Sequence, residues 1–441
     1  MKTETLFHIT VLSNFVLGYD KYSRHYSKKK IPQSTFPEQF FLLRESELDA
    51  GLQKADGLMD RLRIEGDQLI ALKTRVAVEE LHTNTRTGIG RFVSRDWINL
   101  DDVEWVDVDG KRTAAITEEV MAESIRIMNP VLQDFSALRP RSLSILPIAR
   151  GCQASCPFCF SEASASAEQD HERLDLERVR SIAETAAQLG AERFVITGGG
   201  EPGLVRHERL CRLIEVGRTA LAKVVLITNG HHLSNKERID RRKNLEDYRD
   251  AGLEVLAVSR HHHDDAASAR LMSLDTDVAS IARDWHDHQS DWPALRMRLI
   301  CVLQRGGINN MAMMEAYVAW AANLGVRELC FKELYVSTSI ESVYHRHEAN
   351  VWSHSHQVPL SLVLDFADKH EFREVARLPW GAPIFQGEWS GASMQIAAYT
   401  EPSLLWERSQ GIARSWNLMA DGRCLVSLED RCSDISPTFV S

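Results

Sequence analysis

The chain has 441 residues, of which 44% are apolar and 26% are charged. This composition is typical of a globular protein with one large or two ordinary domains, and it excludes a disordered, collagen-like or disulfide-scaffold protein. The formal net charge of −10 gives no global basic surface for holding nucleic acid or anionic lipid. We therefore expect no nucleic-acid partner and no membrane partner.

No apolar run reaches the roughly 18 to 20 residues of a transmembrane helix. The apolar residues 6–18 are interrupted by His8, Ser13 and Asn14, and no small-residue cleavage pattern follows them. We interpret them as a strand or helix of the mature chain and not as a signal peptide. The eight cysteines are too few for a stapled secreted protein of this length, which indicates a reduced compartment. We expect a cytoplasmic protein.

Residues 1–140 lack a regular alternation of strands and helices and are interpreted as an accessory region of unknown role. They contain a basic, tyrosine-containing stretch at 22–30 and a loop rich in Pro and Phe at 32–41. Helical patterns follow at 58–81 and 118–128, with strands expected between them. The three lysines at 28–30 are better explained as a solvated face than as a binding patch.

From residue 143 one unit recurs: a short apolar run, then Gly, Asn, Ser or His residues, then a helical stretch. From the second run onward the starts are about 30 to 40 residues apart, the length of one strand–helix unit. Strands that helices bury on both faces should be nearly continuous in Val, Ile and Leu, as these are. The six runs cover residues 143–148, 194–197, 224–228, 255–259, 297–303 and 329–336.

The segments between the runs have helical periodicity, so each can pack back on the sheet. Two apolar faces are Leu176, Val179, Ile182, Ala183, Ala186 and Leu189, and Met311, Met314, Tyr317, Val318 and Ala321. The fold class predicted is α/β, with a partial, TIM-like (β/α)6 barrel over residues 141–340. An N-terminal accessory region, 1–140, precedes this core and a C-terminal extension, 341–441, follows it. In such folds the chemistry gathers at the carboxyl ends of the strands.

Three cysteines follow the first run with the spacing C-x3-C-x2-C: Cys152, Cys156 and Cys159. Three thiolates can hold a [4Fe–4S] cluster by three corners and leave its fourth iron open for a ligand. A structural zinc site or three unrelated cysteines are the alternatives. Zinc needs a fourth ligand nearby, and none follows before His171.

This motif resembles the signature of the radical S-adenosylmethionine (SAM) superfamily, in which the open iron binds the amino and carboxylate groups of SAM. Phe158, before the third cysteine, matches the family pattern and is implied to lie near the adenine. The second run ends in Gly198, Gly199, Gly200 and Glu201, which resembles the family's GGE motif. The resemblance implies that the glycine backbone approaches the methionine amino group and that Glu201 accepts its N–H groups.

The ends of two further runs agree with this resemblance. Thr228 and Asn229 close the third run, and Ser259 closes the fourth. In the family, polar residues at these places are implied to line the SAM site, with Ser259 near the carboxylate or ribose. Taken alone, Thr228 and Asn229 are ordinary turn-forming residues. The loop after the fifth run, at 301–308, is implied to flank the adenine.

The resemblance covers about residues 142–340. It implies an enzyme whose reduced [4Fe–4S] cluster cleaves SAM to methionine and a 5′-deoxyadenosyl radical, which removes hydrogen from a substrate. An electron donor such as flavodoxin or ferredoxin is implied as a partner. The favoured substrate is a small metabolite of cofactor or natural-product biosynthesis. A ribosomal-peptide maturase, with a leader peptide bound by the N-terminal region, and a noncatalytic iron–sulfur or zinc protein are the alternatives.

Two other groups of polar residues invite a role, although no catalytic residue is assigned. The stretch of three histidines at 261–263 followed by Asp264 and Asp265 could be read as a second metal site, but consecutive side chains cannot easily converge on one ion. A histidine that faces the substrate is the favoured interpretation. Glu333 and Tyr335, on the sixth run, could point into the barrel mouth or be structural.

Near the end, apolar residues 415–419 and 424–428 flank Ala420, Asp421 and Gly422, which predicts a hairpin with a tight turn. It resembles a reduced form of the twitch or SPASM extensions that carry auxiliary clusters in radical SAM enzymes. Only Cys424 and Cys432 remain there, fewer than those extensions have, so an auxiliary cluster is the less favoured reading. We expect the hairpin to lie outside the barrel strands and to close the substrate side of the barrel.

Overall fold

The computed structural model divides the chain into two units, Met1–Leu132 and Gln133–Ser441. In the first unit it describes four strands. In the second it describes residues 134–149, 151–160, 174–337, 342–344, 347–378, 382–402, 407–408, 411–430 and 433–436. The two units are described separately below. The division of the second unit into a core and an extension stays a prediction.

The four strands of the first unit form an antiparallel sheet in the order β2-β1-β3-β4. They are β1 (Thr3–Leu12), β2 (Gln39–Arg44), β3 (Arg75–Asn84) and β4 (Ile89–Asn99). A strand or helix is expected for residues 6–18. A strand is confirmed for the part up to Leu12, which β1 covers. The helix expected at 58–81 is wrong from Arg75 onward, because β3 pairs there with both β1 and β4. The helical pattern at 118–128 and the basic stretch at 22–30 lie outside the described residues.

The second unit is built on a sheet of 11 strands in the order β12-β13-β14-β11-β10-β9-β8-β7-β6-β16-β17. Its centre contains the six expected strands, which are adjacent in chain order and all parallel. They are β6 (Ser142–Leu146), β7 (Arg193–Ile196), β8 (Lys223–Thr228), β9 (Val255–Ser259), β10 (Arg296–Leu303) and β11 (Glu328–Glu333). The described strands form an open sheet and not a closed barrel, which is the partial TIM-like α/β fold predicted.

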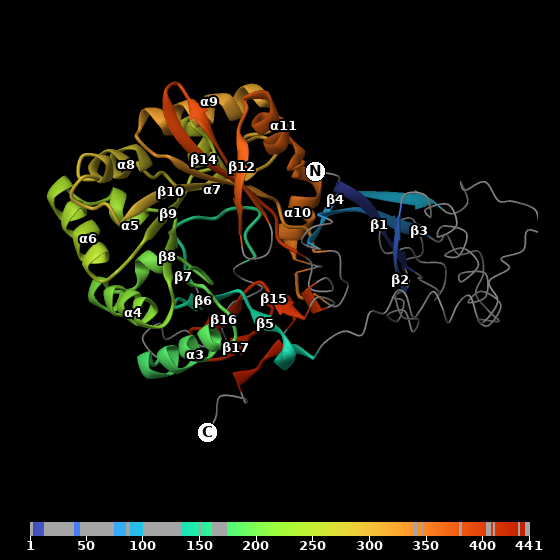
Figure 1. Ribbon diagram of the computed structural model, residues 1–441, viewed down its shortest axis with the longest axis horizontal. Coiled ribbons are helices and arrows are strands. Elements are labelled where there is room, and N and C mark those ends of the chain that lie inside the picture. Colours follow the sequence, from blue (N-terminus) through green and yellow to red (C-terminus); the bar gives the residue numbers. More distant parts are fainter. Residues whose placement is uncertain are drawn as a thin grey trace, which may run out of the picture. The chain divides into compact units, whose positions relative to one another are not determined.

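The helices lie along the outer face of the curved sheet (Figure 1). They are α3 (Leu176–Gln188), α4 (His207–Ala220), α5 (His231–Ser234), α6 (Arg238–Asp250), α7 (Asp265–Met272), α8 (Val278–His286), α9 (Met311–Asn323), α10 (Glu348–His356) and α11 (Ser361–Lys369). Side chains cap several of them: Asp175 accepts from Glu177 N before α3, and Asn310 accepts from Met313 N before α9. The predicted apolar faces of α3 and α9 are buried, but Leu189 follows the last turn of α3 and is 41% exposed.

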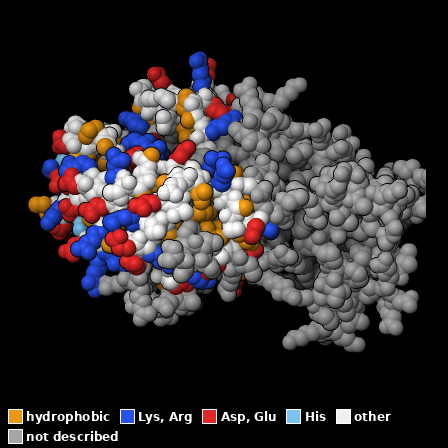
Figure 2. Space-filling view, turned by 60° about the horizontal axis from the view of Figure 1, so that its bottom comes forward, with side chains coloured by type: hydrophobic (Ala, Val, Ile, Leu, Met, Phe, Trp, Pro, Cys, Tyr) orange, Lys and Arg blue, Asp and Glu red, His pale blue; other side chains and the backbone are white. Residues whose placement is uncertain are grey.

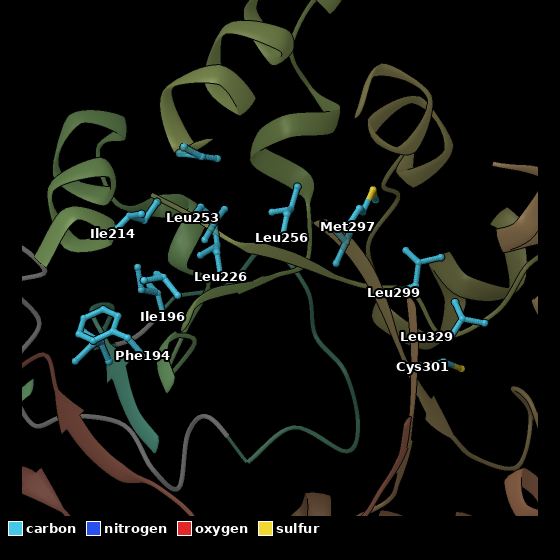
Figure 3. Close-up of a cluster of buried hydrophobic side chains, with 14 of the residues drawn as sticks. Phe194, Ile196, Ile214, Leu226, Leu253, Leu256, Met297, Leu299, Cys301 and Leu329 are labelled. Carbon is cyan, nitrogen blue, oxygen red and sulfur yellow. The ribbon is translucent and has the colours of Figure 1, made fainter. Parts of the chain in front are cut away.

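The main core lies between the strands and the helices. Figure 3 shows Phe194, Ile196, Leu226 and Leu256 directed from the strands toward this layer, where Ile214 of α4 meets them. Successive strand residues alternate in direction, so the intervening positions face the concave side of the sheet. There they form a smaller apolar cluster of Val225, Val255, Ala257, Val195, Ile227 and Ile300.

The sheet continues past the six strands on both sides with segments from residues 373–425. β14 (Ala392–Tyr399) adds in parallel to β11, and β13 (Pro383–Trp389) and β12 (Arg373–Arg377) follow it in antiparallel pairs. On the other side, β16 (Trp416–Met419) adds in parallel to β6, and β17 (Cys424–Leu425) pairs with β16. A pair of two-residue strands, β5 (Arg139–Pro140) and β15 (Ile412–Ala413), lies beside them.

The hairpin predicted near the C-terminus is confirmed, but the expectation that it lies outside the barrel strands is wrong. Gly422 has a φ of 85° in its turn, a conformation that glycine adopts without strain. Trp416 and Leu418 are almost fully buried in the main core. Because these side chains are buried in the main core and β16 pairs with β6, the first strand of the hairpin belongs to the barrel sheet.

The surface of the second unit carries basic and acidic side chains interspersed, with no broad patch of one sign on the face in Figure 2. Among the described residues, none of the helices is long and apolar enough to cross a membrane.

Candidate functional site

The three predicted cysteine ligands lie in a loop after β6 that is fastened to its neighbours by backbone hydrogen bonds. Gly151 opens the loop with a φ of 112°, and its carbonyl accepts from Glu201 N at 2.9 Å. Ser155 N donates to the carbonyl of Met272, at the end of α7, at 2.8 Å. The loop is therefore held between the GGE segment on one side and α7 on the other.

The three side chains are thiols and not disulfides, and they lie close enough to influence one another's ionisation. Cys152 and Cys159 are exposed, and Cys156 is half-buried. Burial, reinforced by the neighbouring Cys159 and Cys152, raises the pKa of Cys156 to about 12. Burial also raises the pKa of Cys152. Such a group of thiols ionises when a metal supplies positive charge.

Among the described residues, no three His, Cys, Asp or Glu side chains converge on a position that could hold a single metal ion. In a structural zinc site the ligands surround one point. A cubane cluster attaches each thiolate to a different iron, so its ligands stand farther apart. Three thiols on one loop are the ligand number and type that hold a [4Fe–4S] cluster by three corners.

The glycines after β7 let two backbone segments approach each other closely. A Cβ on Gly200 would lie 2.1 Å from the Gly151 carbonyl oxygen and 2.6 Å from Cγ2 of Ile148. A Cβ on Gly198 would lie 1.9 Å from the carbonyl oxygen of Gly200. Any larger residue at either position would push the GGE segment away from the cysteine loop.

Glu201 is buried, with 3% exposure, and is held by three donors. Its Oε1 accepts from Gly203 N at 2.7 Å and from the Thr228 hydroxyl, and its Oε2 accepts from Asn229 N at 2.8 Å. Burial raises the pKa of Glu201, and the hydrogen bonds from Asn229, Thr228 and Gly203 oppose the rise. The predicted residues Glu201, Thr228 and Asn229 therefore form one hydrogen-bonded group at the ends of β7 and β8.

Asn229 connects this group to the cysteine loop. Its Nδ2 lies 3.5 Å from Cys152 Sγ and 3.3 Å from Gln153 Oε1, donating to both. Its own Oδ1 accepts from His231 N at 2.9 Å, which fixes the orientation of the amide. A donor aimed at Sγ stabilises the thiolate form of Cys152, which is the form that binds metal.

Phe158 belongs to a row of aromatic rings beside the cysteine loop. Its ring lies 5.2 Å from His261, edge to face, and 5.9 Å from Trp352 of α10. Trp352 in turn stacks on His356 at 3.8 Å. Arg305 N donates to the His356 carbonyl at 2.9 Å, so the loop at 301–308 supports the same row.

Ser259 ends β9 on the concave face, because its register follows that of Val255 and Ala257. It is half-buried and pairs in register with Ile300 of β10. The structure therefore places Ser259 on the same side of the sheet as the inner apolar cluster.

Two histidines of the stretch after β9 accept hydrogen bonds from backbone N–H groups, which is a structural role. Val302 N donates to Nδ1 of His261 at 3.1 Å, and Asp264 N donates to Nδ1 of His262 at 2.9 Å. Asp264 itself caps α7 by accepting from Ala267 N. Burial lowers the pKa of His261 to about 3, so this ring is neutral at physiological pH.

Lys332 and Glu333 of β11 lie on opposite faces of the sheet, and Lys332, not Glu333, lies on the concave side. Glu333 pairs in register with Leu303, a member of the main core, and it accepts from Leu360 N at 3.3 Å and from Thr400 Oγ1 at 3.1 Å. Glu333 therefore supports the helix layer. Lys332 pairs with Val302 and shares the concave side with Ile300, two residues before Val302.

Lys332 is one member of a buried ionic group that sequence reasoning missed. Its Nζ contacts Oε1 of Glu401 at 2.6 Å and lies 4.7 Å from the Tyr399 ring centre. The other oxygen of Glu401 contacts Nη1 of Arg414 at 2.5 Å. Burial alone would raise the pKa of Glu401, but the charges of Arg414 and Lys332 lower it to about 2.

Two further carboxylates lie near this ionic group. Glu407 accepts from Arg414 N, and burial raises its pKa to about 7. Glu429 accepts from the hydroxyls of Tyr335 and, at 2.8 Å, Ser337. The predicted residue Tyr335 is thus engaged by a carboxylate from the C-terminal segment.

Cys424 is fully buried in the main core. Burial raises its pKa to about 12, which disfavours the thiolate. Cys432 lies outside the described residues, so an auxiliary cluster at this pair stays an untested alternative.

Comparison with known proteins agrees with this geometry. The model of the radical SAM superfamily matches residues 146–280, which contain the cysteine loop, the GGE segment and the ends of β8 and β9. GTP 3′,8-cyclase of Pectobacterium atrosepticum is 26% identical over 210 residues, or 46% of this chain and 58% of the relative. GTP 3′,8-cyclase of Aeromonas hydrophila is 24% identical over 216 residues, or 46% of this chain and 57% of the relative. The chain therefore spans less than two thirds of these relatives.

Solved structures give looser likenesses. SuiB of Streptococcus suis bound to S-adenosylmethionine has a TM-score of 0.42 and 15% identity, covering 65% of this chain and 60% of SuiB. Coproporphyrinogen III oxidase (HemN) of Escherichia coli has a TM-score of 0.35 and 14% identity, covering 58% and 55%. The fold assignment above rests on strand order and not on these scores. Residues 146–280, which carry the cysteine motif and the GGE segment, therefore match the radical SAM superfamily.

Proposed function

We propose that the protein is a radical SAM enzyme that removes hydrogen from a small metabolite. The observation that carries the proposal is the direct connection between the cysteine loop and the GGE segment. Glu201 N donates to the Gly151 carbonyl, and Asn229 Nδ2 donates to Cys152 Sγ. Ligands for a cluster and acceptors for an amino acid are thus held in one rigid unit.

In this proposal Cys152, Cys156 and Cys159 hold the [4Fe–4S] cluster. When bound and reduced, this cluster would supply the one-electron reduction of SAM, the radical chemistry by which hydrogen would be removed from the substrate. Glu201 Oε2 accepts one hydrogen bond from the described residues, and a carboxylate oxygen can accept a second, here from the SAM amino group. Phe158 and Ser259 would line the remaining sides.

The concave face of the sheet would receive the substrate. It carries apolar positions near its centre, such as Ile227 and Ile300, and the charged Lys332 near the carboxyl ends. The described helices shield the other face. Catalysis needs the target C–H held near the radical and solvent kept away, which an enclosed concave face can provide.

Anaerobic reconstitution tests the proposal. The loaded protein should contain ~4 Fe per chain, absorb in the visible range, and release 5′-deoxyadenosine when dithionite replaces the biological electron donor, such as a flavodoxin or ferredoxin. A Cys156→Ala variant should lose cluster and product. Cys211→Ala, which removes a thiol of α4 outside the loop, is the matched control. Product from the Cys156→Ala variant would overturn the proposal.

Deuterium tracking identifies the substrate class. A deuterated substrate should transfer its label to 5′-deoxyadenosine, detected by mass spectrometry. GTP is the first candidate, because the two cyclases that resemble this chain are named for it. Label transferred from a peptide and not from small metabolites would favour the ribosomal-peptide maturase instead.

A further inference from the structure

A second set of polar side chains, from α5 and α6, lies next to Oε1 of Glu201. His232 of α5 has a side-chain exposure of 11%, and its Nδ1 lies 3.9 Å from Glu201 Oε1 and 3.4 Å from Thr228 Oγ1. Its Nε2 lies 3.1 Å from the hydroxyl oxygen of Tyr248, in α6. Tyr248 is itself almost fully buried. The chain of contacts therefore runs from the protein interior to the GGE segment.

The hydrogen bonds fix the direction of each proton in this chain. Thr228 has one hydroxyl proton, which it donates to Glu201, and its oxygen accepts from Gly230 N at 3.0 Å. At the contact with Thr228, His232 Nδ1 must therefore be the donor. Burial lowers the pKa of His232 to about 3, so the ring is neutral and carries one proton. Nε2 is then the acceptor for the Tyr248 hydroxyl.

Gly203 provides the space that this arrangement needs. A Cβ on Gly203 would lie 2.2 Å from His232 Nδ1 and 2.9 Å from Glu201 Oε1. The backbone N of Gly203 also donates to Oε1 at 2.7 Å. A glycine at this position therefore brings a donor to Glu201 and leaves room for the imidazole ring beside it.

The contacts to Glu201 are unequal on its two oxygens. Oε1 has Gly203 N, the Thr228 hydroxyl and His232 around it, whereas Asn229 N is the one donor to Oε2 among the described residues. The group around Oε1 prevents the carboxylate from rotating. Oε2 is left with capacity to accept another N–H.

We propose that His232 is a positioning residue for SAM. Together with Tyr248 it orients Thr228 and Glu201 so that Glu201 Oε2 faces the amino group of the ligand. This inference rests on the proposed function, since it assumes that SAM occupies the GGE segment. It assigns His232 no contact with SAM and no part in the radical chemistry.

The test is the equilibrium dissociation constant for SAM, measured anaerobically on the reconstituted full-length protein. His232→Leu should raise the dissociation constant about tenfold, the effect of one lost hydrogen bond in an ordered group. His232→Asn, whose amide can place an N–H near the Nδ1 position, should restore most of the affinity. Tyr248→Phe keeps the buried ring and should give a smaller rise. Gly203→Ala should behave like His232→Leu because it displaces the imidazole.

His207→Leu is the matched control. Its ring lies 5.3 Å from the Tyr248 ring, but its Nε2 pairs with Asp247 at 2.8 Å, and no hydrogen bond or ion pair among the described residues joins it to Glu201. Its SAM affinity should equal that of the wild type. Iron content and melting temperature of every variant separate a binding defect from a folding defect.

The outcomes are distinguishable. Wild-type SAM affinity in both His232→Leu and Tyr248→Phe overturns the inference and leaves the proposed function standing. Equal losses in His232→Leu and His232→Asn would assign the effect to packing, which also overturns it. If the wild-type protein itself binds no SAM, the proposed function fails. If His232→Leu does not fold, Tyr248→Phe against His207→Leu decides the question by the same measurement.

Discussion

Arg414 and Glu401 form an ion pair that connects the two flanks of the barrel sheet. Glu401 follows β14, which extends the sheet beyond β11, and Arg414 precedes β16, which extends it beyond β6. Their side chains meet at 2.5 Å, and Lys332 of β11 contacts the same carboxylate at 2.6 Å. One carboxylate therefore holds together segments that lie on opposite sides of the open barrel.

Glu401 should make the fold sensitive to acid. Its pKa of about 2 in the folded state lies below the ordinary value for glutamate, so its stabilising contribution is present above pH ~4.3 and is lost as the pH falls toward 2. This contribution is about 3 kcal/mol at neutral pH. Glu401→Gln should lower the urea midpoint at pH 7 and should flatten its decline between pH 5 and 2. An unchanged pH profile would show that the pair contributes nothing.

Glu407 should act in the opposite direction. Burial raises its pKa to about 7, so the folded state favours the protonated acid. Its contribution is present below pH ~4.5 and is lost as the pH rises through 7. Glu407→Gln should therefore raise the free energy of unfolding at pH 8 and change it little at pH 4.5. A variant that is less stable than the wild type at pH 8 would contradict this.

Removal of residues from Ser415 onward should unfold the second unit. The deletion takes away β16 and exposes β6, and it removes Trp416, Leu418 and Cys424 from the main core. The loss of several large buried side chains costs more than the stability of a typical domain. Far-ultraviolet circular dichroism and thermal melting of the truncated protein provide the measurement. A folded, cluster-containing product would show that the hairpin is dispensable for the barrel.

Gly200→Ala should separate the cysteine loop from the GGE segment. Its Cβ would lie 2.1 Å from the Gly151 carbonyl oxygen, whereas a Cβ on Gly199 would meet its nearest atom at 3.0 Å. We expect Gly200→Ala to lower both iron retention and SAM affinity strongly. Gly199→Ala, the matched control, should have the milder effect on both. Iron analysis and SAM titration check the ranking, and equal behaviour of the two variants would refute it.

The six central strands could be predicted because each contains a short apolar run. In β6 and β9 both faces are buried, whereas β7 and β10 alternate between buried and half-buried residues. β14 escaped prediction because Ser393 and Gln395 interrupt its apolar residues. The hairpin pattern predicts β16 as a strand but does not predict its pairing with β6. Both join the sheet through pairing with distant segments, which local sequence does not reveal.

The same limit applies to the site. The positions of Glu201, Thr228 and Asn229 followed from the ends of parallel strands, which meet at one edge. The concave position of Lys332 and the outward one of Glu333 depend on register, which neighbouring strands determine. His232 lies two residues after the Asn-Gly pair that follows β8, and nothing in the local sequence distinguishes it. Its proximity to Gly203 and Glu201 is visible only in the folded chain.

The pairing of β6 with β16 has a consequence for synthesis on the ribosome. Ser415 and Ser142, at the start of this pair, are 273 residues apart, so one edge of β6 stays unpaired long after β7 has covered the other. Contacts this distant in sequence close slowly and leave an unpaired strand edge exposed in the meantime. Nascent chains in which residues 416–419 have not yet emerged from the ribosome should therefore remain sensitive to protease and dependent on chaperones, and their emergence should bring protection.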